Sequence, residues 1–239
     1  MDKEKNTKGM KQNCRTTRML NGLLPNNTKR LMTLLVLATL LISVSVSSVN
    51  AASETVSFLY EDGFTGVDDT TGFSNDDTTN NLGVSQLDIL GGKGSVIAYE
   101  NGGSLIFTHR GTRGLGVSGG EEDEIDNVNL LERIEISFDH PYNLHYLELR
   151  SLFMPEGGGD PEEGDIDLYL DGSLVGHEDA VASVTGGDGE WSITYSSPTV
   201  DQIVYYVDNN EAYSSFSEFA VAKLEVERGC VVDSDCDHR

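Results

Sequence analysis

The sequence has few of the residues on which common catalytic and nucleic-acid-binding sites depend. Its 239 residues include three cysteines, five histidines and one tryptophan, and 16 Lys and Arg stand against 40 Asp and Glu. It contains no Gly-x-Ser-x-Gly, His-Glu-x-x-His, Walker or Rossmann motif, and its histidines are not at metal-ligand spacing from one another. These absences argue against the enzyme classes that those motifs mark, so we expect a protein that is not an enzyme.

The one long apolar run lies near the amino terminus. It covers residues 31–46, follows Lys29 and Arg30, and ends in small residues. As a helix it spans about 24 Å, which is less than the thickness of a bilayer core. A long basic n-region, a short apolar segment and a small-residue exit predict a secretory signal peptide over residues 1–51, cleaved after Ala51. The alternative is an uncleaved signal anchor, which would be the chain's contact with the membrane.

Basic residues are scarcer still after the signal peptide. Eight of the 16 Lys and Arg precede Ala52 but only two of the 40 Asp and Glu, which leaves 8 against 38 and a formal charge of −30. A surface this acidic repels phosphate backbones and anionic membranes. We therefore expect no nucleic-acid partner and a secreted, extracellular protein with a solvated acidic surface.

Residues 52–227 alternate between apolar and polar side chains in short runs. These runs are rich in β-branched and aromatic residues and are bounded by Gly, Asp, Asn and Pro, which is typical of strands. The expected strands cover residues 55–61, 95–100, 104–109, 133–139, 144–150, 165–171, 190–196, 202–208 and 219–227. One apolar and one polar face per strand predicts an all-β fold, an antiparallel two-sheet β-sandwich of jelly-roll type, with a barrel as the alternative.

Loops and a tail complete the predicted domain. Residues 62–81 and 155–165 read as polar loops, and residues 211–218 could form one helical turn. Residues 228–239 form an acidic tail that contains Cys230 and Cys236. In an oxidising compartment these two cysteines either pair or remain free, and their spacing alone does not decide between the two.

A glycine-flanked acidic segment is the first candidate metal site. Residues 121–126 contain Glu121, Asp123 and Asp126, whose carboxylates are the oxygen ligands that calcium takes from flexible loops. The segment has no EF-hand spacing, so a hydrated loop is the alternative. Nearby, His109, Arg110 and Arg113 form a local basic cluster that we expect to pair with these acids.

The run "DIDLYLD" is the second candidate. On a strand, Asp165, Asp167 and Tyr169 share one face, and carboxylates two residues apart lie about 6–7 Å from each other. Like charges this close need water, a basic cross-strand partner or a cation. Because the mature chain has so few basic residues, we expect water or a cation. Asp165 and Asp167 complete the predicted calcium ligands.

Residues 104–227, and within them mainly residues 113–127 and 132–153, resemble secreted bacterial β-sandwich domains of PEP-CTERM-type, exosortase-sorted surface proteins. The pattern is Gly-Leu-Gly-Val, a polar Gly/Asp stretch, an Ile-Asp pair, a Glu opening a strand that ends in Phe, and a Leu-rich strand. The matching positions are residues 114–117, Ile125, Asp126, Glu132, Phe138, Leu144, Leu147 and Leu149. The sorting tail of that family is absent here. The resemblance implies an extracellular-matrix or cell-envelope role without enzymatic activity.

Together these features predict a secreted, non-enzymatic β-sandwich that acts in adhesion or scaffolding, with either bound calcium or no cofactor. Its partners would be extracellular polysaccharide or other envelope proteins. One alternative is a carbohydrate-binding module, which needs an exposed aromatic platform; Trp191 shares a strand face with Ile193 and Tyr195, so we expect it in the core. The other alternative is a glycoside-active enzyme, which needs two carboxylates roughly 5–10 Å apart.

Overall fold

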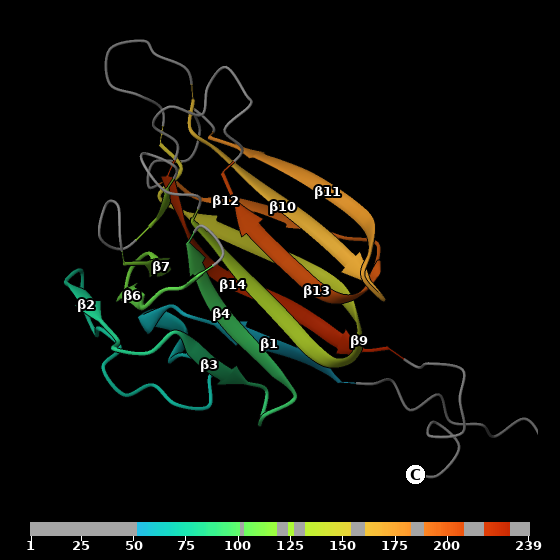
Figure 1. Cartoon of the computed structure of the whole chain (residues 1–239), viewed down its shortest axis with the longest axis horizontal. Coiled ribbons are helices and arrows are strands. Elements are labelled where there is room, and N and C mark those ends of the chain that lie inside the picture. The colour runs from blue at the N-terminus through green and yellow to red at the C-terminus, as the bar shows by residue number, and fades with distance from the viewer. Residues whose placement is uncertain are drawn as a thin grey trace, which may run out of the picture. The chain divides into compact units, whose positions relative to one another are not determined.

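The computed structural model of the chain describes residues 52–100, 103–118, 124–126, 132–153, 161–182, 189–207 and 218–229. All of them belong to the compact unit Ala51–Arg239. Every strand pairing is antiparallel, and the strands form two layers around one apolar core, which confirms the predicted all-β sandwich (Figure 1). Residues 1–51 and 230–239 lie outside the described part, so the signal peptide and the pairing of Cys230 with Cys236 stay predictions.

The first layer runs in the order β11, β10, β13, the first half of β9, β4 and β3. Its strands are β11 (Ser173–Val181), β10 (Glu163–Leu170), β13 (Thr199–Tyr206), β9 (Glu132–Arg150), β4 (Gly94–Glu100) and β3 (Gln86–Ile89), with the short β5 (Gly103–Ser104) beside β4. Because strand neighbours lie side by side, residues that are distant in sequence share one outward face of this layer.

The second layer is built on β14. It contains β12 (Trp191–Thr194), the second half of β9, β14 (Glu218–Arg228), β1 (Ser53–Ser57), β8 (Ile125–Asp126) and the series β7 (Gly114–Val117), β6 (Phe107–Arg110) and β2 (Thr79–Asn81). The 3-10 turn η1 (Tyr60–Asp62) follows β1. In the described part of the chain no helix has the length and hydropathy needed to span a membrane.

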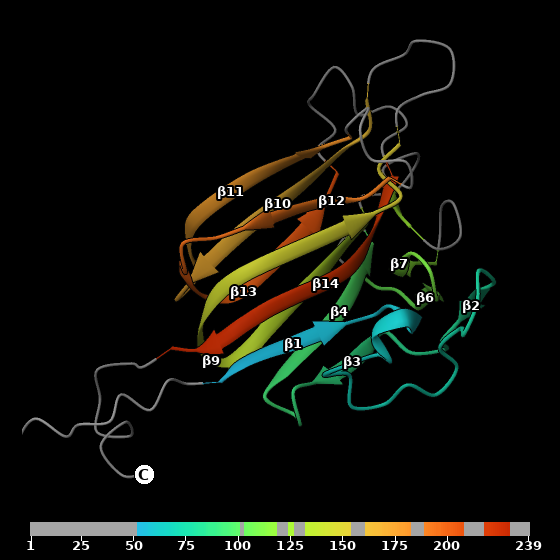
Figure 2. The ribbon, with the colours of Figure 1, turned by 180° about the vertical axis from the view of Figure 1, so that it is seen from behind.

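Strand β9 connects the two layers. Strands were predicted at 133–139 and 144–150, and both ranges are strand, but they belong to one continuous element in which Tyr142 and Asn143 pair with Val200 and Thr199. The register jumps between Val200 and Gln202, so the strand bends there. Figures 1 and 2 show β9 turning back on itself, so that its two halves lie in different layers.

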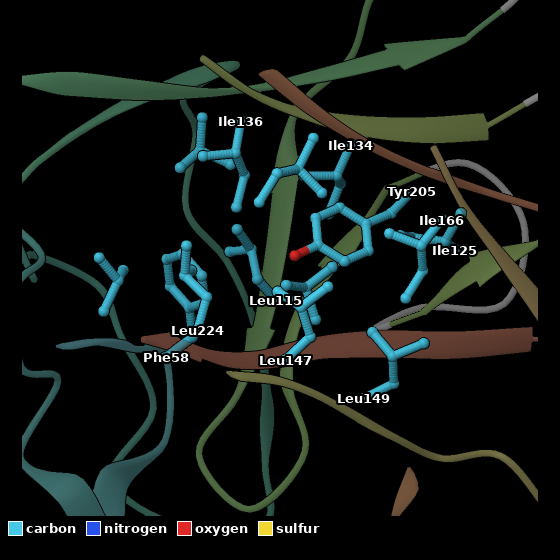
Figure 3. Close-up of a cluster of buried hydrophobic side chains, with 14 of the residues drawn as sticks. Phe58, Leu115, Ile125, Ile134, Ile136, Leu147, Leu149, Ile166, Tyr205 and Leu224 are labelled. Atoms are coloured by element: carbon cyan, nitrogen blue, oxygen red, sulfur yellow. The ribbon is translucent and has the colours of Figure 1, made fainter. Parts of the chain in front are cut away.

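The core between the layers is formed by the alternate side chains that the sequence pattern assigned to it. Ile134 and Ile136 from β9, Ile166 from β10 and Leu224 from β14 are fully buried, and Figure 3 shows them facing one another across the interior. Trp191, Ile193 and Tyr195 pack against this cluster, as predicted. Several labelled side chains also come from short elements that the sequence pattern did not identify as strands, including Leu115 and Ile125.

The segment from 62 to 81, predicted as a polar loop, contacts the second layer through a buried histidine of β6. His109 is fully buried; its Nδ1 accepts a hydrogen bond from the Ser74 backbone N–H at 2.9 Å and its Nε2 lies 2.6 Å from the Phe58 carbonyl. The imidazole packs against the ring of Phe73 at 4.2 Å between centroids. The predicted pairing of His109 with the acids of 121–126 is therefore wrong, because its ring lies in the interior.

Candidate functional site

The outward face of the first layer carries aromatic and polar side chains from β10, β13, β9 and β4. On β10 the alternation places Asp165, Asp167 and Tyr169 on this face, while Ile166 and Leu168 fill the core. The cross-strand register continues the face onto β13, where Tyr206 lies opposite Asp165 and Gln202 opposite Tyr169. The shared face of Asp165, Asp167 and Tyr169 is as predicted.

The face continues across β9 and β4. Arg133 lies opposite Tyr206 on one side and Tyr99 on the other. Its guanidinium carbon is 4.8 Å from the centroid of the Tyr99 ring, a cation–π contact, and its Nε donates to Glu135 at 2.7 Å. The Gln202 amide donates to the other oxygen of Glu135 at 3.3 Å. We call Tyr99, Arg133, Glu135 and Gln202 the β4–β9–β13 cluster.

A second group of polar side chains occupies the β10–β11 hairpin. The pairing of the two strands sets His177 opposite Asp167 and Asp179 opposite Asp165. Nδ1 of His177 lies 2.7 Å from Asp167 Oδ1, and Nε2 lies 2.7 Å from Asp179 Oδ1 and 3.7 Å from Asp165 Oδ1. Expecting only water or a cation beside Asp165 and Asp167 was therefore wrong, because His177 is a basic cross-strand partner. We call Asp165, Asp167, His177 and Asp179 the hairpin cluster.

Two tyrosines join the hairpin cluster to the rest of the face. The hydroxyl groups of Tyr169 and Tyr206 both donate to Asp167 Oδ2, at 3.0 and 3.4 Å. Hydrogen bonding to Asp167 and the nearby Asp179 raises the pKa of His177 against the opposing effect of burial. Burial also raises the pKa of Tyr169, as does its bond to Asp167. Asp167 is thus held by an imidazole and two phenols, which fixes its orientation.

The carboxylates of the hairpin cluster differ in exposure. The side chains of Asp165 and Asp167 are 7% and 16% exposed, whereas that of Asp179 is 61% exposed. One ligand atom each from Asp165, His177 and Asp179 can be chosen so that all three lie within 4.8 Å of one another, a separation at which they could hold a metal ion. An imidazole with several carboxylates is a donor set for divalent cations.

The other predicted calcium ligands do not join this cluster in the described residues. Glu121 and Asp123 lie outside the described part of the chain. Asp126 ends β8, which pairs with β14 and not with β10. Asp126 and the pair Asp165 and Asp167, which were predicted as two separate candidate sites, lie on different strands. Of the basic cluster, Arg113 pairs with the buried Glu124 as predicted, while Arg110 pairs with Asp77.

His177 and Asp179 were not predicted as site residues, because β11 was not predicted as a strand. The local signal for β11 is Asp171-Gly172, one of the dipeptides typical of a two-residue β-hairpin turn. Both residues have positive φ, 51° and 70°, as such a turn requires. Counting outward from the turn without a bulge would instead place Gly176 opposite Asp167 and Glu178 opposite Asp165. The bulge at Leu168 and Tyr169 shifts the register by one residue and brings His177 and Asp179 to those positions.

Comparisons with known proteins return solved structures only: no family model and no curated protein matches the chain. A Streptococcus pneumoniae fucose-binding module is 14% identical with a TM-score of 0.27, covering 77% of this chain and 99% of that one. The lectin-binding domain of lectinolysin in complex with Lewis b is 11% identical with a TM-score of 0.29, covering 44% and 70%. The CBM32-3 module of a family 31 glycoside hydrolase from Clostridium perfringens is 13% identical with a TM-score of 0.26, covering 45% and 73%. At these TM-scores the overlap transfers no binding site to this chain.

Proposed function

We propose that the protein is a secreted, non-enzymatic carbohydrate-binding β-sandwich that acts at the cell envelope or in the extracellular matrix. The observation that carries this proposal is the β4–β9–β13 cluster: a tyrosine ring, a guanidinium, a carboxylate and a primary amide lie side by side on one outward sheet face. Adhesion, the role expected from the sequence, would then follow from glycan binding.

The cluster offers the groups that a sugar ring requires. A saccharide presents hydroxyl groups around its edge and C–H groups on its faces, so its sites combine aromatic surface with a few fixed polar groups. Glu135 accepts hydrogen bonds, Gln202 both donates and accepts, and Arg133 donates. Each is already held by a neighbour, as Arg133 and Gln202 both bond to Glu135. Groups fixed before binding lose little side-chain entropy when a ligand arrives.

The charge of the chain narrows the class of glycan. Net charge is −24 for the full sequence and more negative without residues 1–51. Uronic-acid and sulfated polysaccharides would be repelled by this field and by Glu135 itself. We therefore propose neutral glycans, or glycans with amino groups, as the ligands.

A glycan array followed by calorimetry tests the proposal. The purified protein should bind a neutral or amino-containing glycan, and Tyr99→Ala should weaken binding at least about tenfold, the equivalent of 1.4 kcal/mol. Tyr146→Ala is the matched control, because Tyr146 is also a half-buried tyrosine next to a carboxylate, Glu148, but on the outward face of the other layer. That variant should bind like the wild type.

Three outcomes would contradict the proposal. The wild type could bind no glycan on the array, Tyr99→Ala and Tyr146→Ala could have equal effects, or the wild type could release reducing sugar from a bound glycan. The last result would instead support the glycoside-active alternative.

A further inference from the structure

The orientation of His177 in the hairpin cluster has a consequence beyond glycan binding. Its Nδ1 faces Asp167, a carboxylate that two tyrosine hydroxyls already hold in place. When Nδ1–H donates to Asp167, the Nε2 lone pair points toward Asp179 Oδ1 and Asp165 Oδ1. A lone pair directed at two carboxylate oxygens is repelled by them, so a positive species must lie between Nε2 and these oxygens. That species is either a proton or a metal ion.

The arrangement matches the way proteins prepare a histidine for a metal. A ligating histidine commonly donates its second ring N–H to a carboxylate, which fixes the ring and makes the ligating nitrogen more basic. Asp167 has that position here, and its own orientation is fixed by Tyr169 and Tyr206. The ligand positions lie on two hydrogen-bonded strands joined by a two-residue turn, so the backbone that presents them is rigid.

The donor set selects the class of metal. Calcium takes six to eight oxygen ligands, whereas zinc accepts an imidazole nitrogen and carboxylate oxygens at about 2.0–2.2 Å in a tetrahedral arrangement. In a tetrahedral site with those bond lengths, two ligand atoms lie about 3.3 Å apart. Here Nε2 of His177 is 2.7 Å from Asp179 Oδ1 and 3.7 Å from Asp165 Oδ1. Asp179 is the most exposed of the three residues, so its side chain can move the short distance from Nε2 that a metal ion requires.

We infer that the hairpin cluster is a binding site for a divalent transition metal of the zinc class. Nε2 of His177 and one carboxylate oxygen each from Asp165 and Asp179 are the protein ligands, and water completes the tetrahedron. Asp167 is a positioning residue that holds the imidazole from its other nitrogen. The metal replaces a proton at Nε2, so metal and proton compete for the site.

Zinc titration of the purified full chain against a chromophoric chelator at pH 7.5 tests the inference. One zinc ion should bind per chain, Co²⁺ should give the visible absorption of a four-coordinate ion, and excess calcium should not displace either metal. His177→Gln and Asp179→Asn should each weaken zinc binding at least about tenfold, and Asp167→Asn should weaken it about 10–100-fold. The side chains of His177 and Asp179 are 41% and 61% exposed, so these variants should fold.

The matched control is His140→Gln. His140 is a similarly exposed histidine with a carboxylate neighbour, Asp139 at 3.8 Å, but it lies at the bend of β9. This variant should bind zinc like the wild type. The inference is overturned if the wild type binds no zinc, if His177→Gln binds zinc like the wild type, or if cobalt shows a thiolate charge-transfer band, which would place the metal on one of the three cysteines. No glycan is present in the assay, so its outcome is separate from that of the proposed function.

Discussion

The buried His109 makes the stability of the second layer dependent on pH. The Ser74 N–H donates to Nδ1, so that nitrogen carries no proton, and Nε2–H donates to the Phe58 carbonyl. The folded protein thus holds one neutral tautomer of the ring. A second proton on Nδ1 would break the bond to Ser74 and bury a charge beside Phe73 and Phe64. Burial accordingly lowers the pKa of His109 from 6.5 to about 4.

The sign and size of the effect follow from this lowered pKa. The unfolded chain binds the proton more readily than the folded one, so protonation favours unfolding. The stability contributed by neutral His109 is fully present above pH 6.5 and is lost as the pH falls from 6.5 toward about 4. The whole loss is about 3 kcal/mol, and about 2 kcal/mol of it has occurred by pH 5. The free energy of unfolding of a domain is only about 5–15 kcal/mol.

The perturbation that isolates this effect is His109→Gln, which removes the titrating group. Urea unfolding followed by the fluorescence of the single tryptophan gives the free energy of unfolding at pH 7.5, 6.5, 5.5 and 5.0. At pH 7.5 the variant should be less stable than the wild type, because Gln cannot reproduce both hydrogen bonds and the ring contacts. By pH 5.0 the gap should have narrowed by about 2 kcal/mol.

Ile136→Val is the control for a general loss of packing. Ile136 is fully buried in β9 and is not one of the rings that pack against His109, so its truncation should destabilise the protein by about 1 kcal/mol and leave the surroundings of the histidine unchanged. Its gap to the wild type should be equal at pH 7.5 and 5.0. If the gap for His109→Gln were also independent of pH, His109 would not be held neutral and the reasoning would be wrong.

Three further substitutions test the packing and the charge of the sandwich, each by urea unfolding at neutral pH. Gly114→Ala should lower the free energy of unfolding by about 3 kcal/mol, because φ is 118° and the new Cβ would lie 2.3 Å from the Val221 carbonyl oxygen. An unchanged free energy of unfolding would contradict this close approach. Tyr205→Phe should raise the free energy of unfolding by about 1 kcal/mol, since the buried hydroxyl has no hydrogen-bond partner among the described residues; a decrease would reveal a partner. Arg150→Ala should lower the free energy of unfolding by about 1–2 kcal/mol, because Arg150 forms ion pairs with Glu61, Glu148 and Glu190. A variant as stable as the wild type would mean that water stabilises these carboxylates as well as Arg150 does.

The sequence predicted the fold class because the buried strands alternate cleanly. In the first half of β9, Ile134 and Ile136 are buried and alternate with the polar Arg133, Glu135 and Ser137, so the period of two is clear there. Strand prediction failed where apolar and polar residues do not alternate. All four residues of β7 are buried, and Gly114 and Gly116 have no side chain to mark a face. Strand β11 lies at the edge of its layer and is mostly exposed, so its pattern contains little apolar signal.

Only the residues of the candidate site that lie on one strand could be predicted from the sequence. Asp165, Asp167 and Tyr169 lie on one strand, where spacing alone places them together. The partners of Asp167 come from β11 and from β13, so finding them requires the register of both pairings. A turn dipeptide predicts that β10 and β11 form a hairpin, but it does not predict the bulge at Leu168 and Tyr169 that places His177 opposite Asp167. No local signal gives the pairing of β10 with β13, whose facing residues Asp167 and Val204 are 37 positions apart in the chain.

The charge balance of the two outward faces favours a cation at the hairpin cluster rather than elsewhere on this acidic chain. On the second layer, basic side chains with permanent charges stand among the acids: Arg150 contacts Glu148, and Lys223 lies between Asp62 and Glu225. At the hairpin cluster three carboxylates share contacts with one imidazole, whose positive charge depends on a proton. One imidazolium cannot neutralise three carboxylates, so an excess of negative charge remains. Asp165 and Asp167 are only 7% and 16% exposed, so solvent screens their charges less than that of an exposed carboxylate. A divalent ion supplies the second positive charge that the imidazolium lacks, and this is the electrostatic reason to expect metal at His177 rather than beside Arg150 or Lys223.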